Sequence, residues 1–78
     1  MSWRFEIQGS PDPQTLPRIV GYFAQRWTTP SSLVLQMRDG LMRVEISVED
    51  LDTRQAKIVV AKLQEDVLIC DATIQFVE

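Results

Sequence analysis

The dipeptide Asp39-Gly40 lies midway along the chain and is the strongest constraint on what this sequence can fold into. Asp and Gly tolerate the positive φ angles of tight hairpin turns, so this pair between apolar segments favours a β-hairpin. The following segment, Met42–Glu49, alternates apolar and polar residues, which is the period of a strand with one buried face. The preceding segment, Leu33–Arg38, is β-like but begins with consecutive apolar residues. The middle of the chain is therefore predicted to be a hairpin.

A strand and then a helix are predicted before this hairpin. Residues Trp3–Gln8 alternate between apolar and polar or charged side chains, as a half-buried strand does. After the turn-forming residues Gly9–Pro13, apolar side chains recur mostly at intervals of three and four, which is the spacing of one helical face. This apolar stripe, which is expected to pack against the core, consists of Leu16, Ile19, Val20, Phe23 and Trp27.

The start of this helix allows two interpretations. Asp12 is a favourable N-cap residue, and Pro13 would then occupy the first helical position. Alternatively, Thr15 caps the helix, which places Pro17 in the first turn, where its missing N–H leaves no helical hydrogen bond unmade.

A second helix and a last strand are predicted after the hairpin. Asp52 and Gln55 have the spacing of a capping box, so the helix is expected to begin near Thr53 and to end around Glu65. Its inward positions are Ala56, Val59, Val60 and Leu63. The final strand has alternating apolar residues at Ala72, Ile74 and Phe76.

The order of elements is strand, helix, strand, strand, helix, strand, in a single domain that spans residues 1–78. Two βαβ-like halves joined by a hairpin predict an α+β fold of the ferredoxin-like βαββαβ type. Its four-stranded antiparallel sheet has the order 4-1-3-2, and both helices cover one face. The other face would be polar and carry Arg4, Glu6, Gln8, Arg43, Glu45, Ser47, Glu49, Thr73 and Gln75.

The composition argues against catalysis. The chain has no histidine, so it lacks the usual base of nucleophilic catalysis and the commonest metal ligand. The glycines stand alone and form no phosphate-binding loop. The single cysteine, Cys70, cannot form an internal disulfide or a zinc site of the usual kind, and its place near a strand predicts a small buried side chain. We therefore expect no catalytic residues, no metal site and no cofactor, and predict that the chain is not an enzyme.

The charge balance argues against several partners. The formal net charge is -3 and the pI is about 4.8, which disfavours phosphate backbones and anionic membranes. The RNA-recognition modules of this fold stack bases on strand aromatics, and the outward positions of the predicted first and third strands have none. The apolar runs are short, and the first residues lack a secretory pattern. We expect a cytoplasmic protein that binds neither nucleic acid nor membrane.

One part of the sequence resembles a known family. Residues Leu16–Arg26, with Ser32 and Leu33, resemble the first helix and second strand of ACT domains. The likeness is greatest to the small regulatory subunits of acetohydroxyacid (acetolactate) synthase, an enzyme of branched-chain amino-acid biosynthesis. Any amphipathic helix would supply the apolar matches, so the resemblance depends on Arg18, Gly21, Gln25 and Arg26.

The resemblance implies a non-catalytic regulatory module, a small subunit that binds and regulates a larger amino-acid-biosynthesis enzyme of the acetolactate synthase type. Thiamine diphosphate, metal and flavin would belong to that enzyme. The resemblance also implies a small amino-acid effector held at a dimer interface, near Ser10, Asp12, Gln14, Thr15, Thr28, Thr29 and Ser31. The family has glycine at the positions of Gln14 and Trp27, and asparagine at that of Thr29. A free-standing amino-acid-binding sensor and a plain protein interaction domain are the alternatives.

The sequence also predicts a homodimer, or a heteromer with a partner. Below about 70 to 80 residues a single core rarely supplies more than about 3–5 kcal/mol, and this chain has no disulfide to add to it. In the sheet order 4-1-3-2 the segment Leu33–Arg38 is an edge strand, and its apolar run lacks the lysine, proline or inward charge that protects an edge. The predicted interface consists of Trp27, Leu33, Val34 and Leu35.

Overall fold

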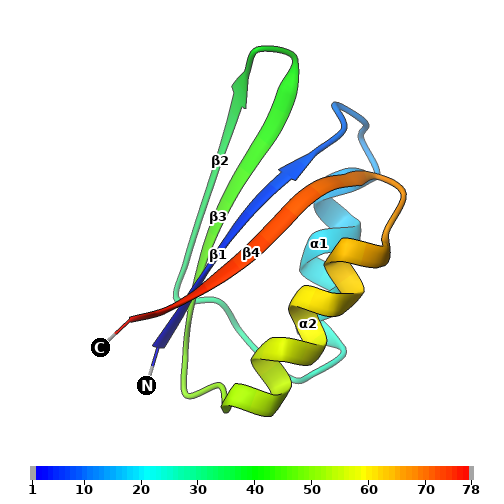
Figure 1. Cartoon of the computed structure of the whole chain (residues 1–78). Coiled ribbons are helices and arrows are strands. Elements are labelled where there is room, and N and C mark those ends of the chain that lie inside the picture. Colours follow the sequence, from blue (N-terminus) through cyan, green and yellow to red (C-terminus); the bar gives the residue numbers. More distant parts are fainter. Residues whose placement is uncertain (1, 78) are drawn as a thin grey trace.

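The computed structural model describes residues 2–77 and has the predicted order of elements. The strands are β1 (Ser2–Gly9), β2 (Ser32–Arg38), β3 (Leu41–Glu49) and β4 (Ile69–Val77), and the helices are α1 (Thr15–Ala24) and α2 (Thr53–Glu65). The strands form one antiparallel sheet of order β2-β3-β1-β4, and both helices lie on one face of it (Figure 1). The ferredoxin-like prediction is confirmed. Between residues 2 and 77, neither helix is long and apolar enough to cross a membrane.

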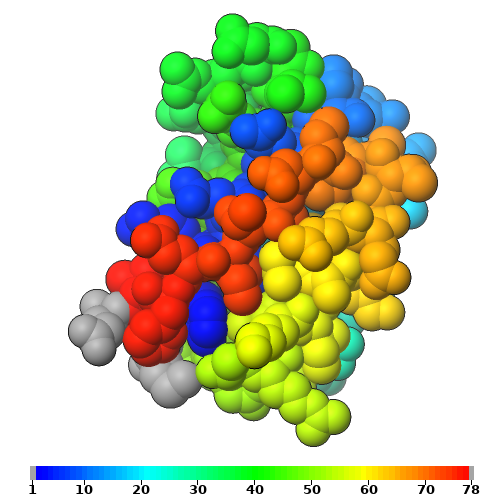
Figure 2. Space-filling view, viewed as in Figure 1, coloured from blue at the N-terminus to red at the C-terminus, as the bar shows by residue number. Residues whose placement is uncertain are grey.

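The β2–β3 hairpin turns at the predicted dipeptide. Asp39 and Gly40 have φ angles of 54° and 77°, and pairing resumes at once between Arg38 and Leu41. A two-residue turn with both φ angles positive matches the right-handed twist of the strands that it joins. The hairpin projects past the helices (Figure 1), and it forms the upper end of the molecule in Figure 2 (green).

The core lies between the sheet and the helices. The inward side chains of β1 and β3 are buried, and Phe5, Ile46 and Phe23 expose no surface at all. The rings of Phe5 and Phe23 meet edge to face at 90°, with centroids 4.9 Å apart, a favoured arrangement of aromatic rings. The other end of the core is closed by Trp3, whose indole Nε1 donates a hydrogen bond to the Leu51 carbonyl at 2.7 Å.

Helix α1 begins with Thr15, and its N-cap is Gln14, whose side chain makes no capping hydrogen bond. Neither Asp12 nor Thr15 is therefore the N-cap, and both interpretations of the cap are wrong. The Asp12 carboxylate instead accepts from the Gln14 N–H, 2.8 Å away, which closes a turn ahead of the helix. The structure does place Pro17 in the first helical turn, where no N–H is needed.

The apolar stripe of α1 is shorter than predicted. Ile19 and Phe23 are fully buried, but Val20 is exposed. The helix ends at Ala24, so Trp27 lies beyond it, with 98% of its surface exposed. The prediction that Trp27 packs against the core is wrong, because the helix ends three residues before it and Trp27 itself has a left-handed backbone conformation.

Helix α2 begins as predicted. The carboxylate of its N-cap, Asp52, accepts a hydrogen bond of 2.7 Å from the Gln55 N–H. Three of the predicted inward residues, Ala56, Val59 and Leu63, are buried. Val60 is half-buried and packs at the edge of the core.

Cys70 is exposed, so the prediction of a buried cysteine is wrong. The strand that contains it begins at Ile69, earlier than the alternation at Ala72 indicated. The β1–β4 register shifts here: Gly9 pairs with Ile69, while the adjacent Gln8 pairs with Asp71. Cys70 is the extra residue of this bulge, and such a residue leaves the regular inward–outward alternation.

The end of β1 depends on a glycine, and we expect Gly9→Ala to destabilise the fold. A Cβ at Gly9 would lie 2.6 Å from Cγ2 of Thr15 and 3.3 Å from the Leu68 carbonyl oxygen. Thr15 is fully buried, so it cannot move aside, and overpacking of this kind costs about 1–3 kcal/mol. Chemical denaturation followed by tryptophan fluorescence measures the loss.

Gly21 supplies the matched control for this substitution. A Cβ there meets nothing within 4 Å, and alanine is favoured over glycine inside a helix by about 0.5–1 kcal/mol. Gly21→Ala should therefore raise the free energy of unfolding. A Gly9→Ala protein as stable as the wild type would contradict the close packing described here.

Candidate functional site

The residues that the resemblance assigned to an effector lie in two loops. Ser10, Asp12, Gln14 and Thr15 lie at the start of α1, and Thr28, Thr29 and Ser31 lie between its end and β2. The 10 residues of α1 separate the two groups, which amounts to about 15 Å at 1.5 Å per helical residue. Within one chain the structure brings the members of each group together, but it does not bring the two groups to one place.

The loop before α1 uses its own polar groups. Asp12 accepts hydrogen bonds from the backbone N–H of Gln14 at 2.8 Å and of Thr15 at 3.0 Å, through its carboxylate and its carbonyl respectively. The Thr15 hydroxyl donates to the Ser10 carbonyl at 2.8 Å, and Pro17 has no N–H to offer. Helix N-termini attract anions, and here the carboxylate of Asp12 already occupies that position. An effector carboxylate would have to compete with it.

The loop after α1 is also internally bonded. The Thr28 hydroxyl donates to the Arg26 carbonyl at 3.1 Å, and Ser31 donates to the Ser47 carbonyl through both its N–H, at 2.8 Å, and its hydroxyl, at 3.1 Å. These bonds tie the loop to the start of the hairpin and leave it little freedom to adapt to a ligand.

Trp27 has a strained backbone, with φ at 53°. The Thr28 N–H donates to the Phe23 carbonyl at 3.1 Å across this residue, which is a Schellman-type helix end that normally carries glycine. The glycine that the resembling family has at this position therefore has a conformational reason.

A buried carboxylate, Asp66, joins the two helices. It lies just past the end of α2, and its side chain has no exposed surface. The Tyr22 hydroxyl donates to Oδ2 of Asp66 at 2.5 Å, Nε of Arg18 lies 3.1 Å from the same oxygen, and the Leu68 N–H donates to Oδ1 at 2.9 Å. A carboxylate can remain charged in such a place because its oxygens accept several hydrogen bonds and face a cation.

The sequence analysis did not identify Asp66 as an important residue. The available signal was the spacing of Arg18 and Tyr22, which are four residues apart and so share one side of a helix. The network also reaches the first loop, since the carbonyl of Leu68 accepts from the Ser10 N–H at 2.8 Å. Arg18, one of the residues that carried the family resemblance, thus has a structural role in positioning this loop.

The surroundings of Asp66 change two pKa values. Burial acts to raise the pKa of the Asp66 carboxyl, but the hydrogen bonds from Tyr22 and Leu68 and the charge of Arg18 outweigh it, and the pKa lies below its ordinary value. The hydrogen bond to Asp66, together with burial, raises the pKa of Tyr22. At neutral pH the carboxyl is therefore charged and the phenol is protonated, which is the combination that the network requires.

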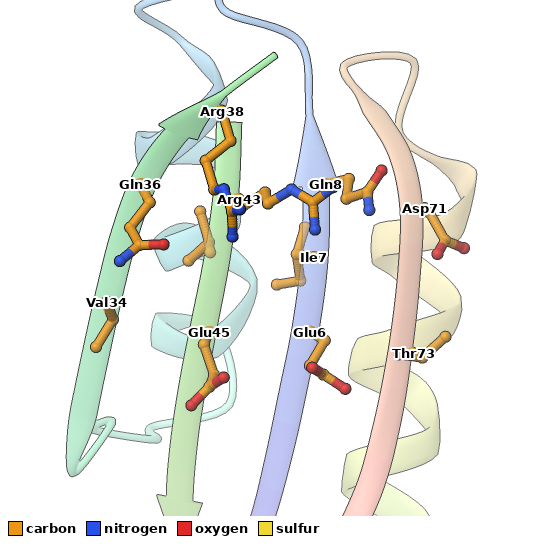
Figure 3. Close-up of a pocket in the computed structure, with 11 residues that line it drawn as sticks. Glu6, Ile7, Gln8, Val34, Gln36, Arg38, Arg43, Glu45, Asp71 and Thr73 are labelled. Carbon is orange, nitrogen blue, oxygen red and sulfur yellow. The ribbon is translucent and has the colours of Figure 1, made fainter. Parts of the chain in front are cut away.

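The open face of the sheet, opposite the helices, contains a pocket of about 420 Å³ near the tip of the hairpin. Its lining is polar and includes residues from all the strands (Figure 3). The predicted polar face is thus present, and part of it is hollowed. None of the residues assigned to an effector lies in this pocket.

The edge strand β2 is apolar and poorly covered. Leu33 and Met37 share the face of their β3 partners Ile46 and Met42, which are buried. Nevertheless, 38% of the surface of Leu33 and 54% of that of Met37 is exposed, and Val34 on the other face is 47% exposed. The helices therefore leave this edge of the sheet uncovered.

The Asp66 network should support the fold most strongly above the acid range. Because the pKa of Asp66 is depressed by folding, its contribution is present above the ordinary aspartate value of about 3.9 and is lost as the pH falls through the lower folded value. Hydrogen bonds to a charged group contribute about 1.5–3 kcal/mol. We expect Asp66→Asn to lower the free energy of unfolding by about that amount at pH 7.

Urea denaturation at several pH values measures this effect, and the difference between Asp66→Asn and the wild type should shrink in acid. The exposed neighbour Glu65 provides a control, because Glu65→Gln removes a charge without disturbing the network and should change stability by less than about 0.5 kcal/mol. A difference that stays constant down to acid pH would show that the charge of Asp66 is not what stabilises the protein.

Comparison with known proteins agrees with this fold. The model of the ACT-like domain family matches residues 1–78. The chain is similar to the ACT domain of a GTP pyrophosphokinase from Chlorobium tepidum, with 16% identity over 96% of this chain and 97% of that one and a TM-score of 0.81. It is also similar to the regulatory subunit of aspartate kinase from Thermus thermophilus, with 13% identity over 95% and 50% of the two chains and a TM-score of 0.71.

A homoserine dehydrogenase from Thiobacillus denitrificans contains a similar region, with 9% identity over 94% of this chain and 16% of that one and a TM-score of 0.80. No curated protein sequence matches. Identities this low show the fold alone, whereas the family match extends over the whole sequence. The chain belongs to the ACT-like domain family.

Proposed function

We propose that this chain is a non-catalytic regulatory module that dimerises through β2 and, as a small subunit, binds a larger amino-acid-biosynthesis enzyme of the acetolactate synthase type. Membership of the ACT-like family supports a regulatory role. One similar structure is named as the regulatory subunit of aspartate kinase. The acetolactate synthase partner is supported by the sequence of α1 and the two residues that follow it, where Arg18, Gly21 and the Gln25-Arg26 pair follow the pattern of its small subunits.

The exposed apolar edge of β2 is the observation that carries this proposal. Leu33, Val34 and Met37 leave apolar surface exposed on both faces of one strand, and an unprotected strand of this kind is a template for pairing with another chain. Pairing two β2 strands about a two-fold axis would continue the sheet and cover these side chains. Trp27, at the end of α1, is a large apolar side chain outside the core that is available for the same interface.

The polar groups of the loop before α1 are hydrogen-bonded to one another, which helps to distinguish a free-standing amino-acid sensor from a module that binds a protein partner. A free-standing amino-acid sensor would need an effector carboxylate at the N-terminus of α1, where the Asp12 carboxylate already binds the Gln14 N–H. This occupancy disfavours detection of a free amino acid at this loop and favours a module that acts through its protein partner. The residues Ser10, Gln14, Thr15, Thr28, Thr29 and Ser31 would then serve to hold the loops in place.

Charge on the edge strand should separate the dimer. We expect Val34→Lys to shift the protein from dimer to monomer in sedimentation velocity, because a lysine there cannot be buried without a partner. The matched control is Thr73→Lys, which places the same charge on the same face but on the opposite edge strand, β4. A wild-type protein that sediments as a stable monomer at micromolar concentrations would refute edge pairing.

Trp27→Gly should change stability and association in opposite directions. The side chain is 98% exposed, so a single chain loses no packing, and relief of the left-handed backbone should stabilise it by about 0.5–1 kcal/mol. Loss of the side chain from the interface should at the same time raise the dissociation constant of the dimer. Unfolding at high dilution and sedimentation equilibrium measure the two effects. Unchanged association would remove Trp27 from the proposed interface.

The role as a small subunit is tested with a purified acetolactate synthase large subunit from the same source. We expect the two proteins to co-elute in size-exclusion chromatography and the chain to raise the synthase activity of the large subunit. Asp12→Ala, which frees the helix N-terminus of α1, serves as a probe of effector sensing in the same assay. Failure to co-elute, with no change in synthase activity at excess chain, would refute this role and leave the dimer test unaffected.

A further inference from the structure

The pocket on the open face of the sheet is lined by two rows of residues that cross the strands in register (Figure 3). The row nearer the hairpin tip runs through Gln36, Arg43, Gln8 and Asp71. The next row runs through Val34, Glu45, Glu6 and Thr73. Arg38 lies two residues beyond Gln36 on β2 and adds a second guanidinium at this end of the pocket. The end near the hairpin tip therefore contains the arginines together with Asp71, and the next row contains a pair of glutamates.

The two arginines are not neutralised by the protein. Arg38 extends from β2 over β3, and Arg43 extends from β3 over β1 beside Gln8, so both guanidinium groups lie at the corner of the pocket near the hairpin tip (Figure 3). Over residues 2–77 the ion pairs are Arg4–Glu45 and Arg18–Asp66, so neither of these two arginines has a carboxylate within 4 Å. In a chain of net charge -3, this corner presents unpaired guanidinium groups beside the amides of Gln8 and Gln36. Donors of this kind suit an oxyanion, carboxylate or phosphate.

The two glutamates of the second row favour a positively charged group of the ligand. Glu6 and Glu45 are direct partners across the β1–β3 pair, and like charges placed directly opposite in a sheet repel each other. Arg4 reduces the repulsion between the two carboxylates only in part, because its Nε lies 3.8 Å from Oε1 of Glu45, which is beyond hydrogen-bond distance. A bound ammonium group would relieve this repulsion and donate hydrogen bonds to both carboxylates.

The spacing of the rows limits the size of the ligand. Residues two apart along a strand are separated by about 7 Å, and charge-assisted hydrogen bonds at each end take up about 2.8 Å. The opposite charges of the ligand must therefore lie within a few ångströms of each other. The pocket volume of about 420 Å³ accommodates a small molecule, and Val34 offers an apolar contact at its side.

We propose that this open-face pocket binds a small zwitterion, with its oxyanion held by Arg38 and Arg43 and its ammonium group held by Glu6 and Glu45. Free α-amino acids and phosphorylated amines such as phosphoethanolamine share this chemistry. The pocket lies on the face of the sheet opposite the helices and contains residues of one chain only. The site is thus separate from the effector loops and does not rest on the proposed function.

Titration of the ¹⁵N-labelled protein followed by NMR tests the proposal, with L-alanine and phosphoethanolamine as the two zwitterionic probes. Saturable shifts are expected at the backbone amides of Gln8, Arg43 and Glu45, in the millimolar range that suits exposed charged groups. The stronger of the two probes identifies the oxyanion that the site prefers. Sodium acetate and ethylammonium chloride, which each carry one half of the charge pattern, should bind more weakly than either zwitterion.

Two charge-removing variants provide the decisive comparison. Arg43→Gln and Glu45→Gln should each weaken binding about three- to fivefold, as expected for exposed ion pairs, while Arg54→Gln on α2, away from the pocket, should bind as the wild type does. Shifts confined to Ser10–Thr15 would instead identify the effector loop and refute this site. Acetate binding as strongly as a zwitterion, or unchanged binding by Arg43→Gln and Glu45→Gln, would also overturn the proposal.

Discussion

The carboxylate of Asp66 is the point at which the separate elements of this small fold are tied together. It receives hydrogen bonds from Tyr22 and the Leu68 N–H and faces Arg18, so it fixes the angle of α1 to the end of α2 and the start of β4. Leu68 in turn binds Ser10, which sets the conformation of the loop that begins α1. Separating a buried charge from its partners is costly, because it leaves the charge unpaired. Arrangements of the helices that take Arg18 and Tyr22 away from Asp66 are therefore disfavoured.

That arrangement determines which surfaces are left for binding. The helices cover the inward faces of β1 and β3, where residues such as Phe5 and Ile46 are fully buried, but β2 keeps apolar side chains exposed. Two short helices cannot cover four strands completely, and the strand left uncovered is at the edge of the sheet. The opposite face is mainly polar and contains the pocket. The two surfaces meet at Val34, which lies on the edge strand and also lines the pocket.

The fold could be predicted from the sequence because its signals are local and agree with one another. The hairpin turn at Asp39-Gly40 and the alternation of β3 each depend on neighbouring residues, and together they permit one topology. The sequence analysis was wrong where contacts between distant parts of the chain determine whether a residue is buried. Cys70 is exposed because a bulge shifts the register of β4, and Trp27 is exposed because α1 ends early in a left-handed residue. Asp66 was not recognised because its partners lie on a helix distant in sequence, and no local pattern records such a contact.

The candidate sites could be predicted from the sequence less well than the fold, because they depend on how residues of different elements lie in space. The resemblance identified polar residues at both ends of α1, but it could not show that the Asp12 carboxylate bonds to its own loop. Arg43, Glu6 and Glu45 were predicted to be outward, but Arg38 was not identified, and only the register placed Glu6 directly opposite Glu45. In a chain this short a single core rarely supplies more than about 3–5 kcal/mol. The proposed association through β2 would therefore be linked to folding, because whatever binds the folded state also stabilises it. The uncovered edge strand would be the physical basis for that linkage.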